Sequence, residues 1–190
     1  MESLQALKSR LGAVRNISQI TKAMEVVSAT KMRRAQEVAL RSRAYAVRAL
    51  EILGKMVKNA PLEIPLTKSR PVKATLLLLV ASDRGLAGPF NAQVFRAVDN
   101  FTLADEDAKR AGHSFLSVAV GKKAAGYAAK KGLKALRSFS GFGDFATPEE
   151  VEPLAELVVT GFEEGKWDRV VAVSTHFRTT LKQETLVRQI

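Results

Sequence analysis

Histidine is the residue type that most often donates or accepts protons near neutral pH, and this chain has two, His113 and His176. The first precedes a predicted strand, and the second stands beside Phe177 near the end of another. Neither has a convincing serine or carboxylate companion in the local sequence, as a nucleophile or a proton relay would require. There is no cysteine and no spacing typical of metal ligands. The sequence therefore predicts no catalytic residue, no metal site and no cofactor.

A second place for chemistry is the loop Ser82–Asn91, which contains two glycines and leads into a predicted helix. Loops of this kind can cradle an anion with backbone N–H groups. However, the loop has neither the GxxxxGK(S/T) nor the GxGxxG pattern of phosphate sites, and Asp83 would set a negative charge beside a phosphate. We therefore expect a tight strand-to-helix turn with an exposed contact residue, Arg84. An anion-binding α/β enzyme that uses this loop stays open as a third hypothesis, by fold analogy.

The elements that must position these residues begin with a continuous apolar run, residues 73–82, which predicts a strand buried on both faces as in a parallel sheet. Alternating helical and strand patterns follow it. They are a helix over 90–104, a strand over 114–120, a short basic helix over 122–131, a possible strand over 132–139, an acidic helix over 148–164 with Thr147 as its N-cap, a buried strand over 169–175 and an extended segment over 179–190. This order predicts the α/β class, with a small doubly wound, Rossmann-like and mostly parallel sheet.

Residues 3–53 form an unusually long helical pattern, because the stretch holds one glycine, Gly12, and no proline. A helix of that length reaches roughly 75 Å. Its apolar residues follow spacings of three and four, with one irregular step, as the seam of a coiled coil requires. This seam consists of Leu4, Leu7, Leu11, Val14, Ile17, Ile20, Met24 and Val27. The other explanation is a long amphipathic helix that lies on its own domain.

These patterns divide the chain into three parts. We predict a long coiled-coil helix over residues 1–58, a linker over 59–72 and an α/β domain over 73–190; the linker contains Pro61 and Pro65. No run approaches the ~20 apolar residues of a transmembrane helix. Met1 leads directly into the helical pattern, without the charged start and apolar core of a secretion signal. We therefore expect membrane contact only through partners.

Positive charge is concentrated in the long helical stretch. The formal net charge is +11, and residues 1–60 contribute +8 of it, from 12 Lys and Arg against 4 Glu. A basic helix favours an acidic partner, and nucleic acid, an anionic membrane surface and an acidic protein loop are the candidates. A face that is simply solvated is the alternative, and it suits the clustered Lys31, Arg33 and Arg34 least well.

Two groups of residues carry a family resemblance. On the long helix they are Ile20–Met24, Val27 and Lys31–Arg34, and after the first strand they are Ser82–Gly88 and Asn91. In this order they closely resemble the gamma subunit of the F-type ATP synthase, and the resemblance extends over essentially the whole chain. It implies the central stalk, a non-catalytic rotor subunit that couples proton flow through the membrane sector to ATP synthesis in the α3β3 ring. The implied partners are the alpha, beta and epsilon subunits and the c-ring, and no nucleic acid is expected to bind. The resemblance also implies that the subunit lies peripherally on the cytoplasmic face of the bacterial inner membrane.

The resemblance also implies which residues lie at subunit interfaces. On the helix the candidates are Lys22, Met24, Lys31, Arg33 and Arg34, and on the loop they are Arg84, Leu86 and Ala87. Ala87 stands where many members of the family have cysteine. The basic residues of the helix are expected to face acidic loops of the beta subunits.

In that family the N-terminal helix pairs with a long C-terminal helix in an antiparallel coiled coil, whereas this sequence ends at Ile190. We therefore expect a truncated chain whose apolar seam lacks its usual partner. The alternative function, suggested by the net charge, is a basic helical adaptor that binds nucleic acid. It does not account for the seam, and the helix offers only Tyr45 as an aromatic side chain for base stacking.

Overall fold

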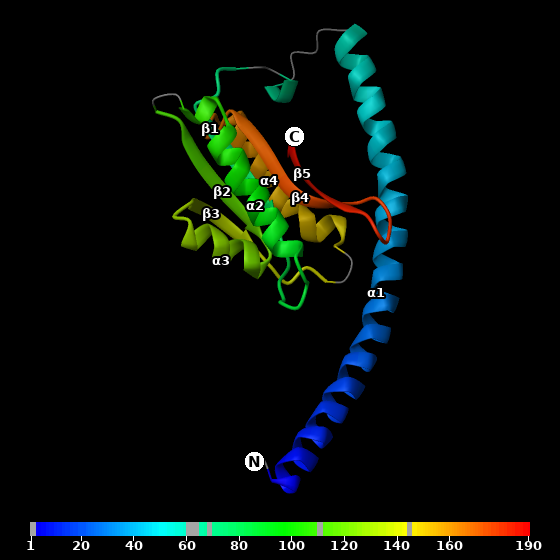
Figure 1. The fold of residues 1–190 in the computed structure, drawn as a ribbon. Coiled ribbons are helices and arrows are strands. Elements are labelled where there is room, and N and C mark those ends of the chain that lie inside the picture. The colour runs from blue at the N-terminus through cyan, green and yellow to red at the C-terminus, as the bar shows by residue number, and fades with distance from the viewer. Residues whose placement is uncertain (1–2, 60–64, 68–69, 110–111, 144–145) are drawn as a thin grey trace. The chain divides into compact units, whose positions relative to one another are not determined.

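The computed structural model describes residues 3–59, 65–67, 70–109, 112–143 and 146–190. The chain separates into two compact units, Met1–Pro61 and Leu62–Ile190, which are described one at a time. The first is a single long helix, and the second is an α/β unit (Figure 1). Parts of the linker predicted over 59–72, namely 60–64 and 68–69, lie outside the described residues.

Helix α1 runs without interruption from Leu4 to Asn59, over 56 residues, which corresponds to about 84 Å. The helical pattern of the sequence weakens after Gly54, but the helix passes through that glycine. An isolated glycine costs only about 1 kcal/mol in a helix, and the next proline in the chain is Pro61. In the described part of the chain, no helix combines the length and the hydropathy needed to cross a membrane.

The eight side chains of the predicted seam are exposed on α1. Their exposed fractions run from 48% at Met24 to 72% at Leu4. Contiguous apolar surface of this extent marks a contact site, because isolated proteins seldom leave so much of it in water. The helix therefore carries a long exposed apolar stripe.

The α/β unit is built on one five-stranded sheet, in the order β3-β2-β1-β4-β5. The strands are β1 (Ala74–Val80), β2 (Ser114–Val120), β3 (Lys134–Phe139), β4 (Arg169–Phe177) and β5 (Gln183–Gln189). The first four are parallel, and β5 runs antiparallel to β4. The predicted α/β class with a mostly parallel sheet is confirmed.

The described part of this unit also contains α-helices and short 3-10 helices before and between the strands. They are η1 (Pro65–Thr67), α2 (Phe90–Ala104), η2 (Asp107–Lys109), α3 (Lys122–Lys130) and α4 (Pro148–Glu163). Helix α4 begins with the predicted N-cap, because Thr147 and Glu150 exchange side-chain and backbone hydrogen bonds in a capping box. Strand β4 extends beyond its predicted end at Thr175, because Phe177 pairs with Gln183 of β5 in a hairpin.

The two faces of the sheet have separate hydrophobic cores. Leu77 and Leu79 of β1 belong to the core under α2 and α3, whereas Leu76 belongs to the core under α4, on the other side of the sheet (Figure 1). This arrangement explains the continuous apolar run of the sequence, since both faces of the middle strand are buried. Trp167 completes the core under α4, where its Nε1–H donates to the carbonyl of Val158 at 3.2 Å.

Candidate subunit interface

The loop after β1 leaves the sheet at its topological switch point. The chain passes from β1 through α2 to β2 on one side, and β4 pairs with the other side of β1. In open α/β sheets, binding sites gather beside such a point, at the carboxyl ends of the strands. The structure brings three of the predicted interface residues together in this loop, Arg84, Leu86 and Ala87.

Hydrogen bonds tie the two ends of the loop to each other. The backbone N–H of Ser82 donates to Asn91 Oδ1 at 3.1 Å, and Asn91 Nδ2 donates back to Ser82 Oγ at 2.8 Å. Ser82 Oγ in turn donates to the carbonyl of Arg84 at 2.6 Å. The loop is therefore a tight strand-to-helix turn, as the glycines of the sequence indicate.

The carboxylate of Asp83 connects this loop to two other segments. Its Oδ1 accepts the backbone N–H of Lys122, the first residue of α3, at 2.9 Å, and its Oδ2 accepts that of Gly141 at 2.8 Å. The N–H of Gly141 and then that of Lys122 hold the pKa of Asp83 below its usual value. Because this carboxylate occupies the start of α3, that helix end offers no free anion site. From the sequence alone, Asp83 is only a charge that disfavours phosphate.

Gly121 lets the carboxyl ends of the strands approach closely behind the loop. Its φ is +96°, and a Cβ at this position would lie 2.2 Å from the carbonyl oxygen of Ala81. Its N–H donates to the carbonyl of Phe139 at 2.8 Å, so it joins the ends of β1, β2 and β3. This role of Gly121 was not predicted from the sequence. The available signal is a glycine between a predicted strand and a helix that starts at Lys122.

Leu86 forms the exposed tip of the loop. Its side chain is 95% exposed, and its φ is +60°, in the left-handed region. Residues other than glycine adopt this conformation rarely, and it persists where the surrounding structure imposes it, as at binding sites. Arg84 and Ala87 are exposed as well. The loop thus presents a cation and an apolar side chain from a base held by hydrogen bonds.

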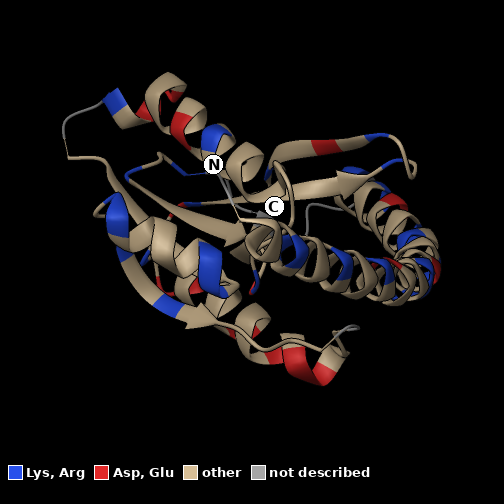
Figure 2. Cartoon of the chain, turned by 60° about the horizontal axis from the view of Figure 1, so that its bottom comes forward, with Lys and Arg blue, Asp and Glu red and all other residues tan. Residues whose placement is uncertain are grey.

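The five candidates on α1 are all exposed, and they spread over about 200° of the helix circumference instead of lining one narrow face. At about 100° per residue, Lys22 and Arg33 lie within about 20° of each other, and Lys31 lies within about 20° of Met24 on the seam. Arg33 forms an exposed ion pair with Glu37, at 3.8 Å. Figure 2 shows Lys and Arg recurring along α1, with fewer acidic segments between them. α1 and the loop belong to different units, so each is a candidate surface by itself.

A partly buried ion cluster that the sequence did not predict lies at the amino ends of the strands. Arg169 pairs with Asp105 and, at 3.1 Å, with Asp107. Its Nε and Nη2 also donate to Thr75 Oγ1, at 3.2 and 2.9 Å. His113 Nε2 lies 3.1 Å from the same hydroxyl, so this histidine belongs to a structural cluster. Within the described ranges, no group of His, Asp and Glu is arranged to hold a metal ion.

Comparison with known sequences covers nearly the whole chain. Residues 3–190 match a family model described as ATP synthase. The ATP synthase gamma chain of Roseiflexus castenholzii is 34% identical over 193 residues, which cover 100% of this chain and 66% of that relative. The gamma chain of Anaeromyxobacter sp. (strain K) is 35% identical over 194 residues, with the same two coverages. The chain therefore spans 66% of the length of these relatives, slightly less than two thirds.

Chains in two solved structures have a fold similar to that of this chain. The central stalk and c-ring structure of the Tetrahymena thermophila mitochondrial ATP synthase contains a chain that matches with a TM-score of 0.67 at 24% identity, over 90% of this chain and 71% of that one. A rotor chain of the Euglena gracilis mitochondrial ATP synthase matches with a TM-score of 0.61 at 16% identity, over 98% of this chain and 62% of that one.

The fold places this chain in the class of proteins that join a long helix with an exposed apolar stripe to a small doubly wound α/β unit. The family match over residues 3–190 and the relatives above 30% identity specify the member of that class. The chain belongs to the ATP synthase gamma chain family. The resemblance carried by residues 20–34 and 82–91 is thereby confirmed.

Proposed function

We propose that this chain is a rotor subunit of an F-type ATP synthase and that it couples proton flow through the membrane sector to ATP synthesis in an α3β3 ring. In this proposal residues 1–58 form the shaft, 59–72 the linker and 73–190 the α/β domain. The catalytic groups belong to other subunits. The observation that carries the proposal is the match of residues 3–190 to the family.

The exposed seam of α1 supports a shaft made of paired helices. Fully burying an apolar side chain of this size contributes about 1.5 to 3 kcal/mol, and the seam has eight that are now roughly half exposed or more. A second helix packed along the seam in a coiled coil would remove this surface from water. A paired helix also resists bending and twisting better than a single one, as a part that transmits torque must.

The arrangement of positive charge on α1 suits a turning contact. In the proposal Lys22, Lys31, Arg33 and Arg34, together with Met24, meet acidic loops of the beta subunits. Because these cations spread over about half of the helix circumference, the number of them that faces a given loop changes as the shaft turns. Exposed ion pairs contribute only about 0 to 1 kcal/mol each, so they can be exchanged as the shaft turns. Arg84, Leu86 and Ala87 form a second contact, between the α/β domain and a beta subunit.

The proposed mechanism is a mechanical bias on catalytic subunits that have more than one stable state. The asymmetric shaft favours a different state in each catalytic subunit, and rotation moves that bias from one to the next. The α/β domain links the shaft to the epsilon subunit and the c-ring. The subunit then lies peripherally on the cytoplasmic face of the bacterial inner membrane.

The test uses ATP synthase assembled in vesicles with a gamma chain that contains this sequence. We expect ATP hydrolysis to drive proton pumping in the complete complex. Omission of the gamma chain should abolish pumping even where some hydrolysis continues. Equal pumping with and without this chain would contradict the proposal.

The charge of residues 1–60 favours nucleic-acid binding as the second candidate function. A cation-rich helix binds DNA or RNA non-specifically, with dissociation constants of roughly 10⁻⁴–10⁻⁶ M at physiological salt. Fluorescence anisotropy with a labelled duplex and a labelled single strand separates the two functions. The rotor proposal expects nothing tighter than this range, whereas binding several orders of magnitude tighter would favour the adaptor.

A further inference from the structure

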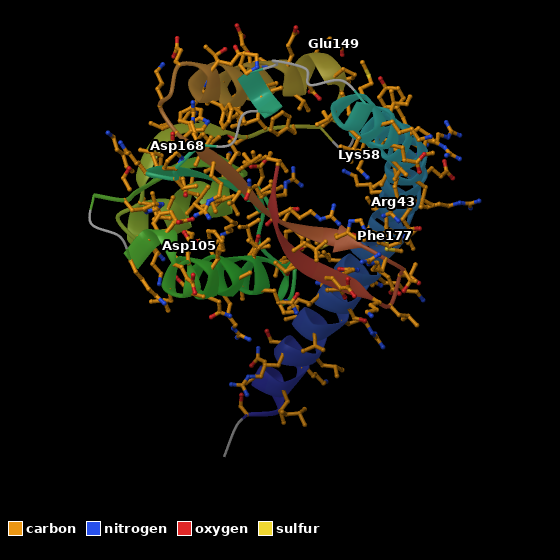
Figure 3. All side chains as sticks on the ribbon, turned by 90° about the horizontal axis from the view of Figure 1, so that it is seen from above. Arg43, Lys58, Asp105, Glu149, Asp168 and Phe177 are labelled. Carbon is orange, nitrogen blue, oxygen red and sulfur yellow. The ribbon has the colours of Figure 1, made fainter. Side chains whose placement is uncertain are left out.

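A cavity of about 670 Å³ lies within the α/β unit, between helix α4 and the edge strand β3. Its volume is within the range of roughly 300–1,000 Å³ that small-molecule sites have. One face of α4 forms a wall, because the lining residues recur at spacings of three and four. They are Pro153, Glu156, Leu157, Thr160 and Gly161. Figure 3 labels Glu149 in the first turn of this helix and Asp168 directly before β4.

The floor of the cavity is apolar. It is lined by Leu116 of β2 and by the ring of Trp167, which is 1% exposed. The indole fits beneath α4 because residue 161 is glycine: a Cβ there would lie 2.0 Å from Trp167 Cη2. Such a floor favours the apolar part of a ligand, since contact with it removes apolar surface from water.

Strand β3 forms the second wall, and a β-bulge lets three of its side chains line the cavity. In a regular strand Lys134 and Leu136 would share one face of the sheet, and Arg137 would lie on the other. The pairing with β2 skips Leu136, because the adjacent residues 117–118 pair with Ala135 and Arg137. Bulges of this kind redirect side chains at sheet edges. Lys134, Leu136 and Arg137 therefore all line the cavity.

Positive charge predominates in the lining. Lys166 is compensated by an ion pair with Glu164, at 2.5 Å, whereas within the described ranges neither Lys134 nor Arg137 forms an ion pair. The one lining carboxylate, Glu156, belongs to the α4 wall. Cations on an edge strand also discourage pairing with another strand, but that role does not require a bulge that brings a guanidinium to a cavity.

We propose that this cavity binds a small organic anion with an apolar body, of the fatty-acid carboxylate class. The apolar chain lies over Leu116 and Trp167, and the carboxylate lies at Lys134 and Arg137. The carboxylate of Glu156 disfavours the opposite orientation, since it would repel the anion at the α4 wall. The site lies wholly within the α/β unit and does not depend on the rotor function.

Trp167 is the only tryptophan of the chain, so its fluorescence reports on this cavity and not on the apolar seam of α1. The probe is dodecanoate with bromine at the end of its chain, because bromine quenches tryptophan at short range. It is titrated into the 190-residue chain at physiological salt and below its micelle concentration. We expect saturable quenching with a dissociation constant on the order of 1 mM or lower, which is the usual ligand efficiency for a molecule of this size. The trimethylammonium cation of the same bromoalkyl chain should bind roughly tenfold more weakly.

The variant Lys134→Gln/Arg137→Gln tests the anion contact. Its dissociation constant should rise by about three- to twentyfold, since two exposed charge contacts are lost. The matched control is Lys123→Gln/Lys130→Gln, which removes the same charge from exposed positions of α3, on the other face of the sheet. This control should bind the probe as the unsubstituted chain does.

Leu136→Gln tests the apolar wall separately, at a side chain that is 40% exposed, and it should also weaken binding. Circular dichroism establishes that each variant keeps its fold, and if the double variant does not, Leu136→Gln decides. Absence of saturable quenching would overturn the inference. It would also be overturned by equal quenching from the carboxylate and the cation, or by equal affinities of the cavity variants and the α3 control.

Discussion

Asp83 caps helix α3 from a different part of the chain: its Oδ1 accepts the backbone N–H of Lys122 at 2.9 Å. A carboxylate at a helix start interacts favourably with the partial positive charge of the unpaired N–H groups. The same carboxylate also anchors the loop, because the exposed tip at Leu86 follows Asp83 by three residues. The carboxylate of Asp83 therefore ties the loop Ser82–Asn91 to the start of α3 and to Gly141.

Removal of this cap should lower the free energy of unfolding and make the loop Ser82–Asn91 open more often. For Asp83→Ala we expect a loss of about 1 kcal/mol in the free energy of unfolding, the usual cost of a lost N-cap. Urea denaturation measures the loss, and hydrogen exchange should show faster opening in residues 82–91. Glu152→Ala, at an exposed carboxylate of α4, is the control and should change neither. Identical behaviour of the two variants would rule out the linking role of Asp83.

The stability of the α/β unit should fall in acid. Backbone N–H groups lower the pKa of Asp83, and the ion pair with Lys131, at 2.7 Å, is the main cause that lowers the pKa of Asp99. Such groups contribute stability that is fully present above the unfolded pKa of about 4 and is lost as pH falls through the folded pKa. Urea midpoints between pH 7 and pH 3 should therefore drop most steeply below about pH 4. In Asp83→Asn/Asp99→Asn the drop should be shallower, and an unchanged slope would refute this assignment.

Two glycines of the same region should respond to alanine with opposite signs. At Gly121 a Cβ would lie 2.2 Å from the Ala81 carbonyl oxygen and φ is positive, so Gly121→Ala should destabilise the unit by more than about 3 kcal/mol or prevent folding. Gly126 lies inside α3 with open space around it, so Gly126→Ala should stabilise the unit by about 0.5 to 1 kcal/mol. Thermal unfolding compares them. A stable Gly121→Ala variant would show that the close approach is not required.

The apolar seam of α1 should make the 190-residue chain self-associate. Exposed stripes of this size drive association, and sedimentation velocity should show species larger than the monomer. Ile17→Gln should reduce the association, since it places an amide in the seam. Val26→Gln is the matched control: this side chain is 64% exposed, against 59% for Ile17, and it lies about 180° around the helix from it. Equal effects of the two substitutions would mean that the association does not use the seam.

The cations of α1 should act collectively in the assembled enzyme. Single alanine substitutions at Lys22, Lys31, Arg33 and Arg34 should change coupling little, because each exposed pair contributes about 0 to 1 kcal/mol and is weakened by salt. Replacing all four should lower the ratio of proton pumping to ATP hydrolysis in vesicles, and charge reversal should lower it further.

Met24→Lys is the sharper single substitution on the same helix. It adds a cation beside Lys31 on the seam side, where an extra ion pair to an acidic loop would slow rotation and lower the pumping ratio. Arg41→Ala, an exposed position of α1 outside the candidate set, is the control. If Met24→Lys and the quadruple alanine variant both keep the ratio of the unsubstituted enzyme, these residues do not carry the coupling.

Much of the fold was predictable because its signals are local. Absence of proline over residues 3–53 predicts the long helix, and its continuation through Gly54 shows only that one glycine is too weak a stop. The apolar run of β1 and the Thr147–Glu150 capping box likewise consist of residues that are close together in the sequence. The loop Ser82–Asn91 could be identified for the same reason, since its turn depends on residues within the loop itself.

The long-range contacts of the α/β unit were decided by tertiary structure alone. Asp83 meets Gly141 across 58 positions, Arg70 meets Trp167 across 97, and Arg169 meets Thr75 across 94. A carboxylate or guanidinium in a sequence shows that a charge needs a partner, but it does not show which one. The choice depends on which backbone groups the folded sheet brings within about 3 Å, and a parallel sheet brings together strands that are far apart in the chain.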